Sequence, residues 1–201
     1  MVKLRFIHAS SDATSLDIYL NDNKIIERMK YKSITDYIDV PNECILNFRI
    51  SGAPKNSPPI FYIKFKFEPE ISSFTAFLIG LAGSKEKKDG INVIVLQDQV
   101  VSLNSAVIRL INASPAIDSA LFKFKDGSLI QNLEYGKAFQ ITTRAGKKIL
   151  QVIKDNNTIT ETTLDILDGK IYEVILVGLT ERKPPLELCV LSHNWLSLFI
   201  T

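Results

Sequence analysis

Two stretches of this chain, one near its start and one just past its middle, have nearly the same sequence. RFIHASSDATSLDIYL runs from Arg5 to Leu20, and RLINASPAIDSALFKF runs from Arg109 to Phe124. The same offset aligns Ala9 with Ala113, Ser10 with Ser114, Tyr31 with Tyr135 and Leu46 with Leu150, and after short deletions Gly80-Leu81 aligns with Gly178-Leu179. This repeat predicts two copies of one folding module, residues 1–104 and 105–201, each long enough to bury its own core.

Apolar and polar residues alternate within each copy with the period of a β-strand. In FYIKFKF (61–67) the phenylalanines and isoleucine take every second position. Three runs are almost continuously apolar, as in strands covered on both faces: FTAFLIGL (74–81), INVIVL (91–96) and YEVILVGL (172–179). Turn-forming pairs separate the runs, among them Asn21-Asp22, Asp126-Gly127 and Asp168-Gly169. The pattern predicts an all-β fold of two tandem antiparallel β-sandwich domains, immunoglobulin-like or transthyretin-like, packed through the connection 97–105.

The charge balance argues against a nucleic-acid-binding protein. The 24 Lys and Arg residues nearly match the 22 Asp and Glu residues, and both halves share this balance. The densest basic run, at 85–88, lies between apolar runs and is typical of a solvated hairpin tip. No segment reaches the roughly 18 apolar residues of a membrane span, and the start of the chain lacks a secretory signal. Cys44 and Cys189 fall at non-equivalent places, which argues against a disulfide framework.

A series of short motifs resembles one bacterial family. The motifs are H-A-S-S-D-A (8–13), D-I-Y-L (17–20), Y-K-S-I-T-D-Y-I-D-V-P (31–41), R-I-S-G-A-P (49–54) and V-L-Q-D (95–98). Their order is similar to that of the bacterial domain-of-unknown-function family 4397, whose members commonly carry the module in tandem. The resemblance covers nearly all of the chain, closely in the first module and loosely in the second. It implies a tandem β-sandwich protein, often found at bacterial surfaces, with no known reaction.

The chain departs from the family pattern at the first turn. Ser11 and Thr14 stand where the family commonly has proline. In the second module Asn112 and Ala116 stand where His8 and Asp12 stand in the first. Chemistry that needs both the histidine and the aspartate is therefore expected only once in the chain.

His8, Ser10 and Asp12 carry the residue types of a nucleophile, a base and an orienting acid. On an extended strand, residues two apart share a face but lie about 6.5–7 Å apart, too far for direct hydrogen bonds. If the chain turns at Ser10, the serine and aspartate are expected to bind the backbone amides of their own turn. We favour this structural role over a hydrolase.

Metal and nucleotide sites find little support in the sequence. Asp12, Asp17, Asp36 and Asp39 are hard oxygen ligands suited to calcium, but no D-x-D-x-D-G loop is present. With only His8 and His193 and two scattered cysteines, a zinc site is not expected. The glycine-rich phosphate-binding motifs G-x-x-x-x-G-K and G-x-G-x-x-G are both absent from the sequence. We expect no metal and no cofactor.

The tyrosines are candidates for a binding surface. Tyr19, Tyr37 and Tyr62 fall on the polar sides of their strands, where exposed rings can hold a sugar or a partner protein. Tyr31 and Tyr135 occupy equivalent positions, which favours a structural role at the edge of the core over binding.

Two loops and the end of the chain could also make contacts. Lys55 and Asn56 lie in the proline-rich loop GAPKNSPP (52–59), and GSKEKKDG (83–90) is a flexible charged loop. The tail WLSLFI (195–200) is apolar enough that we expect it to dock on a module or on another subunit.

These observations favour a non-enzymatic structural or binding module. We expect contacts with a protein partner, or self-association through a sheet edge or the tail, without nucleic acid or membrane insertion. The expected location is the cytoplasm, or the cell envelope or a spore layer. The alternative is recognition of carbohydrate or peptidoglycan through the tyrosines.

Overall fold

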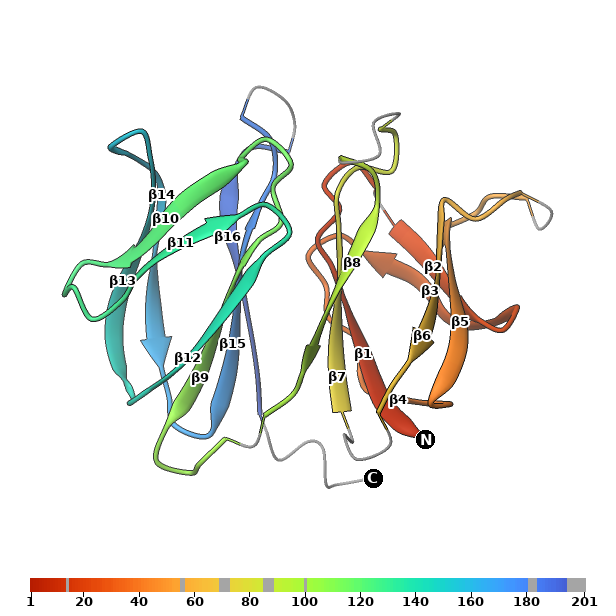
Figure 1. Cartoon of the computed structure of the whole chain (residues 1–201), viewed down its shortest axis with the longest axis horizontal. Helices are drawn as coiled ribbons and strands as arrows, with labels where there is room; N and C mark the ends of the chain where they lie inside the picture. Colours follow the sequence, from red (N-terminus) through yellow and green to blue (C-terminus); the bar gives the residue numbers. More distant parts are fainter. Residues whose placement is uncertain are drawn as a thin grey trace. The chain divides into compact units, whose positions relative to one another are not determined.

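The computed structural model describes residues 1–13, 15–54, 57–68, 73–84, 89–99, 101–180 and 184–194. The chain divides into two compact units, Met1–Asp98 and Gln99–Thr201. Each unit contains two four-stranded β-sheets, and the described residues include no helix (Figure 1). The all-β sandwich class predicted from the alternation is confirmed.

In the first unit, the sheets have the strand orders β4-β1-β7-β8 and β3-β2-β5-β6. Their strands are β1 (Val2–His8), β2 (Ser15–Leu20), β3 (Asn23–Lys30), β4 (Ile38–Val40), β5 (Glu43–Ile50), β6 (Phe61–Lys66), β7 (Ser73–Ile79) and β8 (Asn92–Gln97). Leu4 and Phe6 of the first sheet share one buried core with Ile18 and Phe48 of the second. The Phe6 and Phe48 rings meet edge to face, with their centroids 6.1 Å apart, so each sheet buries its apolar face against the other.

In the second unit, the sheets have the orders β12-β9-β15-β16 and β11-β10-β13-β14. Their strands are β9 (Ala106–Asn112), β10 (Ser119–Phe124), β11 (Ile130–Glu134), β12 (Ala138–Thr143), β13 (Gly146–Lys154), β14 (Asn157–Ile166), β15 (Lys170–Val177) and β16 (Glu187–Asn194). Ile108 and Leu110 share a core with Phe122 and Leu150 of the facing sheet. The strand order repeats that of the first unit, as the sequence repeat predicts.

The sequence predicted antiparallel sheets, but one strand pair in each unit is parallel. β1 pairs with β7 in parallel, with Arg5 opposite Thr75, and β9 pairs with β15 in parallel, with Arg109 opposite Glu173. Parallel neighbours need a long crossover, and here the chain crosses through the other sheet before it returns. β7 is buried along its whole length, which agrees with the apolar run that predicted a covered strand.

INVIVL was predicted to be covered on both faces, and this is wrong. It forms β8, the outermost strand of its sheet, whose side chains are only partly buried. An apolar run shows that neither side of a strand is fully solvated, but it does not show whether the strand has one neighbour or two.

Candidate functional site

His8, Ser10 and Asp12 lie where β1 ends and the chain turns toward β2. The His8 ring is fully buried, its Nδ1 accepts the backbone N–H of Ser10 at 3.3 Å, and it packs edge-on against Tyr31. The Ser10 hydroxyl donates to Asp12 at 3.4 Å. The serine hydroxyl is therefore directed at the carboxylate and not at the imidazole, which is not the hydrogen-bond order of a catalytic triad.

The electrostatics of His8 also disfavour catalysis. Burial lowers the pKa of His8 from 6.5 to about 4, and the Ala13 carbonyl and the Asp12 carboxylate counter only part of this shift. The ring is neutral at physiological pH, and with this pKa it is a weak general base.

Asp12 joins two distant parts of the first unit. Its carboxylate accepts the backbone N–H groups of Ala82 at 2.6 Å and Gly83 at 2.8 Å. The prediction that Asp12 binds amides of its own turn is therefore wrong, because its partners follow β7. The carboxylate acts as a clamp between the turn after β1 and the loop after β7.

The second unit has the same turn with a different side chain. Asn112, at the place of His8, accepts the Ser114 backbone N–H at 3.3 Å, as His8 accepts that of Ser10. Its Nδ2 donates to the carbonyls of Ile117 at 2.9 Å and Leu133 at 3.2 Å. Ile117 corresponds to Ala13, so the Asn112 amide donates to the counterpart of the carbonyl that raises the pKa of His8. His8 and Asn112 therefore share one contact, the acceptance of the backbone N–H two residues further along the chain.

Tyr19 and Tyr62 lie in one row on the outer face of sheet β3-β2-β5-β6. Tyr19 on β2 is opposite Asn47 on β5, and Asn47 is opposite Tyr62 on β6. The two tyrosines are thus two strands apart, about 10 Å between their Cα atoms. Tyr62 is 69% exposed, and the neighbouring Ile45 is 42% exposed.

The ring of Tyr19 is already in contact with two cations. The Arg49 guanidinium lies 5.0 Å from its centroid and the Lys24 ammonium 5.9 Å. Lys24 also pairs with Asp17 at 3.0 Å. Burial alone would raise the pKa of Asp17, but the Arg28 N–H, the Ser51 hydroxyl and Lys24 outweigh it and hold the pKa below its usual value. Tyr19 therefore belongs to a cluster of polar side chains that contact one another, whereas the side chain of Tyr62 is exposed to solvent.

Tyr37 does not join the other two tyrosines. It precedes β4 in the opposite sheet, where its hydroxyl donates to Asp98 at 2.9 Å and its ring lies 4.6 Å from the Arg5 guanidinium carbon. The structure places the three candidate tyrosines on two different sheets, so they do not form one platform. Tyr31 is half-buried against His8, consistent with a place at the edge of the core.

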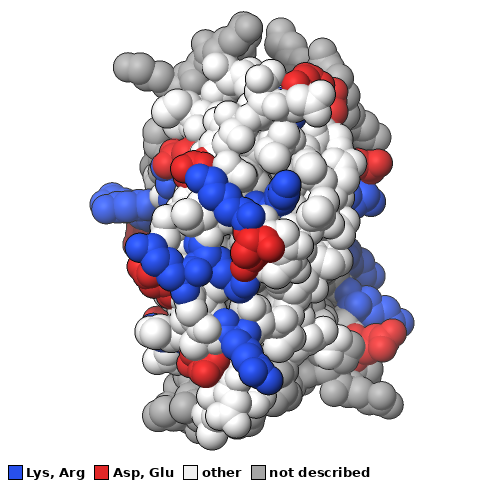
Figure 2. Space-filling view, turned by 90° about the vertical axis from the view of Figure 1, so that its left-hand side faces the viewer, with Lys and Arg blue, Asp and Glu red and all other residues white. Residues whose placement is uncertain are grey.

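The corresponding face of the second unit has a different chemistry. On sheet β11-β10-β13-β14, Lys123 is opposite Gln151 and Gln151 is opposite Glu161. Glu161 pairs with Lys125 at 3.1 Å and accepts from Gln151 at 3.1 Å. Figure 2 shows basic side chains gathered in the middle of this face with acidic ones beside them. The row that carries tyrosines in the first unit is charged in the second.

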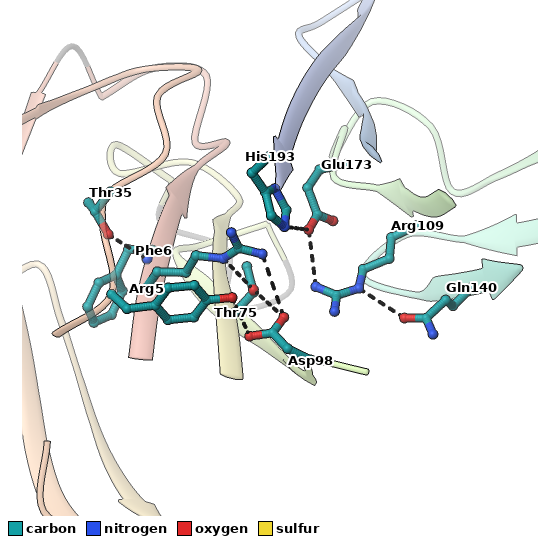
Figure 3. Close-up of polar contacts among 10 residues, drawn as sticks. Arg5, Phe6, Thr35, Thr75, Asp98, Arg109, Gln140, Glu173 and His193 are labelled. Atoms are coloured by element: carbon teal, nitrogen blue, oxygen red, sulfur yellow. Dashed lines mark hydrogen bonds and ion pairs between the residues drawn. The ribbon is translucent and has the colours of Figure 1, made fainter. Parts of the chain in front are cut away.

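Each unit also buries an arginine on its first strand, in the sheet that lacks the tyrosine row. In the first unit Arg5 donates to Thr75 at 2.8 Å and lies 3.7 Å from Asp98, which accepts the Thr75 hydroxyl at 2.7 Å (Figure 3). In the second unit Arg109 pairs with Glu173 at 3.1 Å and donates to Gln140 at 2.9 Å. The sequence signal for this pair is an arginine at the same place in two strands that are mostly apolar.

The two arginine networks occupy equivalent positions. Thr75 and Glu173 are the parallel partners of the two arginines. Asp98 follows β8 beside Ser73, and His193 on β16 is opposite Ile171. Asp98 and His193 therefore occupy the same register position in their units. In the first unit the carboxylate is that of Asp98, just after the edge strand β8, and in the second it is that of Glu173 on the inner strand β15. Paired in this way, these buried side chains act as structural ion pairs.

The four candidate calcium ligands do not converge. Asp12 binds two amides and Asp17 binds Lys24, whereas Asp39 lies 3.7 Å from Lys3 and Asp36 is exposed. Within the described ranges, no group of three or more His, Cys, Asp or Glu side chains could hold a metal ion.

Some of the predicted contact residues lie outside the described residues. These are Lys55, Asn56, the basic run 85–88 and the tail 195–200. Cys44 and Cys189 are both buried. No helix in the described part of the chain is long and apolar enough to cross a membrane.

A family model covers more than half of the chain. It is the model of a domain of unknown function, DUF4397, and it matches residues 2–120, which include β1 to β9 and the clamp formed by Asp12. The chain belongs to the DUF4397 family. The match agrees with the resemblance seen in the sequence motifs. No curated protein matches the chain closely enough to count as a relative.

Two solved structures show distant similarity to this DUF4397 chain. One is a candidate cell adhesion protein from Bacteroides ovatus, with 9% identity, a TM-score of 0.29, and coverage of 96% of this chain and 97% of that one. The other is the Bacillus anthracis TIE protein, with 10% identity, a TM-score of 0.29, and coverage of 89% of this chain and 34% of that one. Similarity this low carries no inference about what the chain binds.

Proposed function

We propose that this DUF4397 protein is a non-enzymatic binding module that holds a protein partner on the outer face of sheet β3-β2-β5-β6. The observation that carries the proposal is the 69% exposure of Tyr62. Tyrosine is enriched at protein interfaces because it contributes a large rigid contact area together with one polar atom.

The surroundings of Tyr62 suit a protein interface. Ile45 on β5 is opposite Lys64 on β6, and Lys64 is two residues from Tyr62 on the same face. An aromatic ring, an aliphatic side chain and a cation therefore lie side by side on a regular sheet. Such a patch supplies a desolvated centre with a charged rim. The cluster around Tyr19 gives this patch a rigid border.

The polar residues of the motif support a non-enzymatic function. His8 and Asp12 satisfy backbone groups, and the second unit makes the His8 contact with an asparagine. A side chain whose contact can be made by an amide is not required to exchange protons.

The test places a photo-crosslinking amino acid at Tyr62 and, as the matched control, at Ile130, an exposed residue of the second unit. A partner captured from position 62 alone is purified, and its Kd is measured for the wild type and for Tyr62→Ala. We expect Tyr62→Ala to weaken binding by about tenfold or more, and Ile130→Ala to leave it unchanged. Unchanged binding by Tyr62→Ala, or an equal loss in both variants, contradicts the proposal.

The location is tested separately by fractionating the native host during growth and sporulation. We expect the protein with the envelope or spore layers, where a module of this kind would assemble. Recovery in the cytosol alone would limit the partner to soluble proteins. Saccharide binding lost in Tyr62→Ala, without a protein partner, would favour the carbohydrate alternative at this face.

A further inference from the structure

The second unit contains an open groove on the outer face of sheet β11-β10-β13-β14. Its volume is about 440 Å³, within the usual range for small-ligand sites. The apolar floor consists of the Leu121 and Ile153 side chains. The rim is polar, with Asp118 and Asn132 on one side and the Lys154-Asp155 turn on the other. None of these residues has a part in the function proposed above.

The groove follows from substitutions and not from the fold itself. Leu121 is opposite Ile153, and the same register in the first unit holds Asp17 opposite Arg49. There Asp17 binds Lys24 and the Ser51 hydroxyl, and Arg49 donates to the Ser57 carbonyl at 3.0 Å. An ion-paired polar cluster thus occupies in the first unit the place that has an apolar floor in the second.

The rim retains hydrogen-bonding capacity. Ser119 donates to the Asn132 side-chain oxygen at 3.0 Å, which orients the amide and leaves its N–H groups available. Asp118, Lys154 and Asp155 have no ion pair within the described part of the chain, so their charged groups can meet a ligand. The rim therefore offers carboxylate acceptors, an ammonium donor and an amide around an apolar floor.

This combination matches the chemistry of a sugar. A pyranose ring has one face of C–H groups, which suits the Leu121 and Ile153 floor, and a rim of hydroxyls that both donate and accept. Two carboxylates disfavour an anionic ligand, and Lys154 beside Asp155 disfavours a strongly cationic one. Hydroxyl groups tolerate both signs, so charge complementarity selects a neutral ligand.

We propose that the groove between Asp118 and Asp155 binds a neutral saccharide of one or two pyranose units. The ring lies on Leu121 and Ile153, the carboxylates accept from its hydroxyls, and Asn132 and Lys154 donate to them. The site is independent of Tyr62, which lies on the other unit.

The experiment is an NMR titration of the full chain with four probes: diacetylchitobiose, cellobiose, maltose and mannobiose. At least one probe is expected to shift the amide signals of Leu121, Asn132 and Asp155 in a saturable way. Absence of a saturable shift with all four probes overturns the proposal. Saturable shifts confined to other residues overturn it as well.

Two variants locate the binding. Leu121→Asp with Ile153→Arg copies the Asp17 and Arg49 pair that the first unit already tolerates, and is expected to weaken binding by more than about tenfold. Asn132→Ala, an exposed and milder change, is expected to weaken it severalfold and serves if the double variant does not fold. Ile130→Ala, which changes an exposed side chain of the same unit outside the groove, is the matched control and should leave the Kd unchanged.

The same variants separate the other occupants. Equal affinity in wild type and Asn132→Ala, for a probe that still shifts the groove signals, contradicts the assigned rim contacts. Saturable binding of a short uncharged peptide with no response to any saccharide would replace the sugar by a peptide. Because the groove variants are scored with saccharides and Tyr62→Ala with the protein partner, failure of the saccharide site and failure of the partner face give different results.

Discussion

Replacing His8 with asparagine should remove a pH dependence from the stability of the first unit. Burial holds the pKa of His8 at about 4, against 6.5 in the unfolded chain. Between these values the unfolded chain binds more protons, so the free energy of unfolding rises with pH and falls as the solution is acidified. The difference of about 2.5 pKa units corresponds to about 3 kcal/mol, present above pH 6.5 and lost by about pH 4.

The His8→Asn variant is compatible with the fold, because Asn112 makes the equivalent contacts in the second unit. We expect it to cost about 1 kcal/mol at neutral pH, since the smaller side chain loses the contact with Tyr31. The higher stability of the wild type at neutral pH should therefore disappear or reverse in acid.

The assay is urea unfolding followed by circular dichroism across the range from neutral pH to pH 4.5, together with NMR titration of the His8 ring. The wild type should lose about 2–3 kcal/mol more than His8→Asn over this range. Carboxylates elsewhere titrate equally in both proteins and cancel in the comparison. Equal losses, or a His8 pKa near 6.5, would refute the buried neutral histidine and with it the argument against catalysis.

Two further perturbations test the fold itself. A Cβ at Gly80 would collide with the Gly90 carbonyl, and one at Gly178 with the Pro185 carbonyl, and both glycines have positive φ, of 87° and 92°. Either change to alanine should destabilise its own unit by at least about 2 kcal/mol in chemical unfolding, and a neutral effect would contradict the collision of the added Cβ with the facing carbonyl. Glu173→Ala leaves Arg109 buried without its carboxylate and should cost about 3–5 kcal/mol of stability by the same measurement. The double variant Arg109→Met with Glu173→Leu replaces both charges by apolar side chains and should recover most of this lost stability. If the single and double variants are equally unstable, the ion pair is not the cause.

The parts of the fold that depend on local sequence could be predicted. Alternation identified the strands, and the Asn21-Asp22 turn adopts the positive φ angles, 45° and 68°, that its residues favour. The repeat predicted two units with one strand order. Parallel pairing of β1 with β7 could not be predicted, because a period of two shows which face a residue occupies and not which strand lies beside it.

The site was harder to predict for the same reason. Tyr37 and Tyr62 both fall on polar positions of their strands, but one is bound to Asp98 under an arginine and the other is open. Asp12 was expected to serve its own turn, yet its partners Ala82 and Gly83 are some seventy residues away. Long-range partners of polar side chains leave no trace in a single sequence.

Comparison of the two units indicates which differences the fold explains and which it does not. A buried arginine requires a carboxylate, and both units meet this requirement, although Asp98 follows β8 and Glu173 lies on β15. No such requirement applies to the outer faces, yet Tyr62 in one unit corresponds in register to Glu161 in the other, and Asp17 to Leu121. Since folding does not demand these differences, they are the places to look for binding. The two units of this chain are therefore expected to recognise different ligands, and a variant that impairs one should leave the other intact.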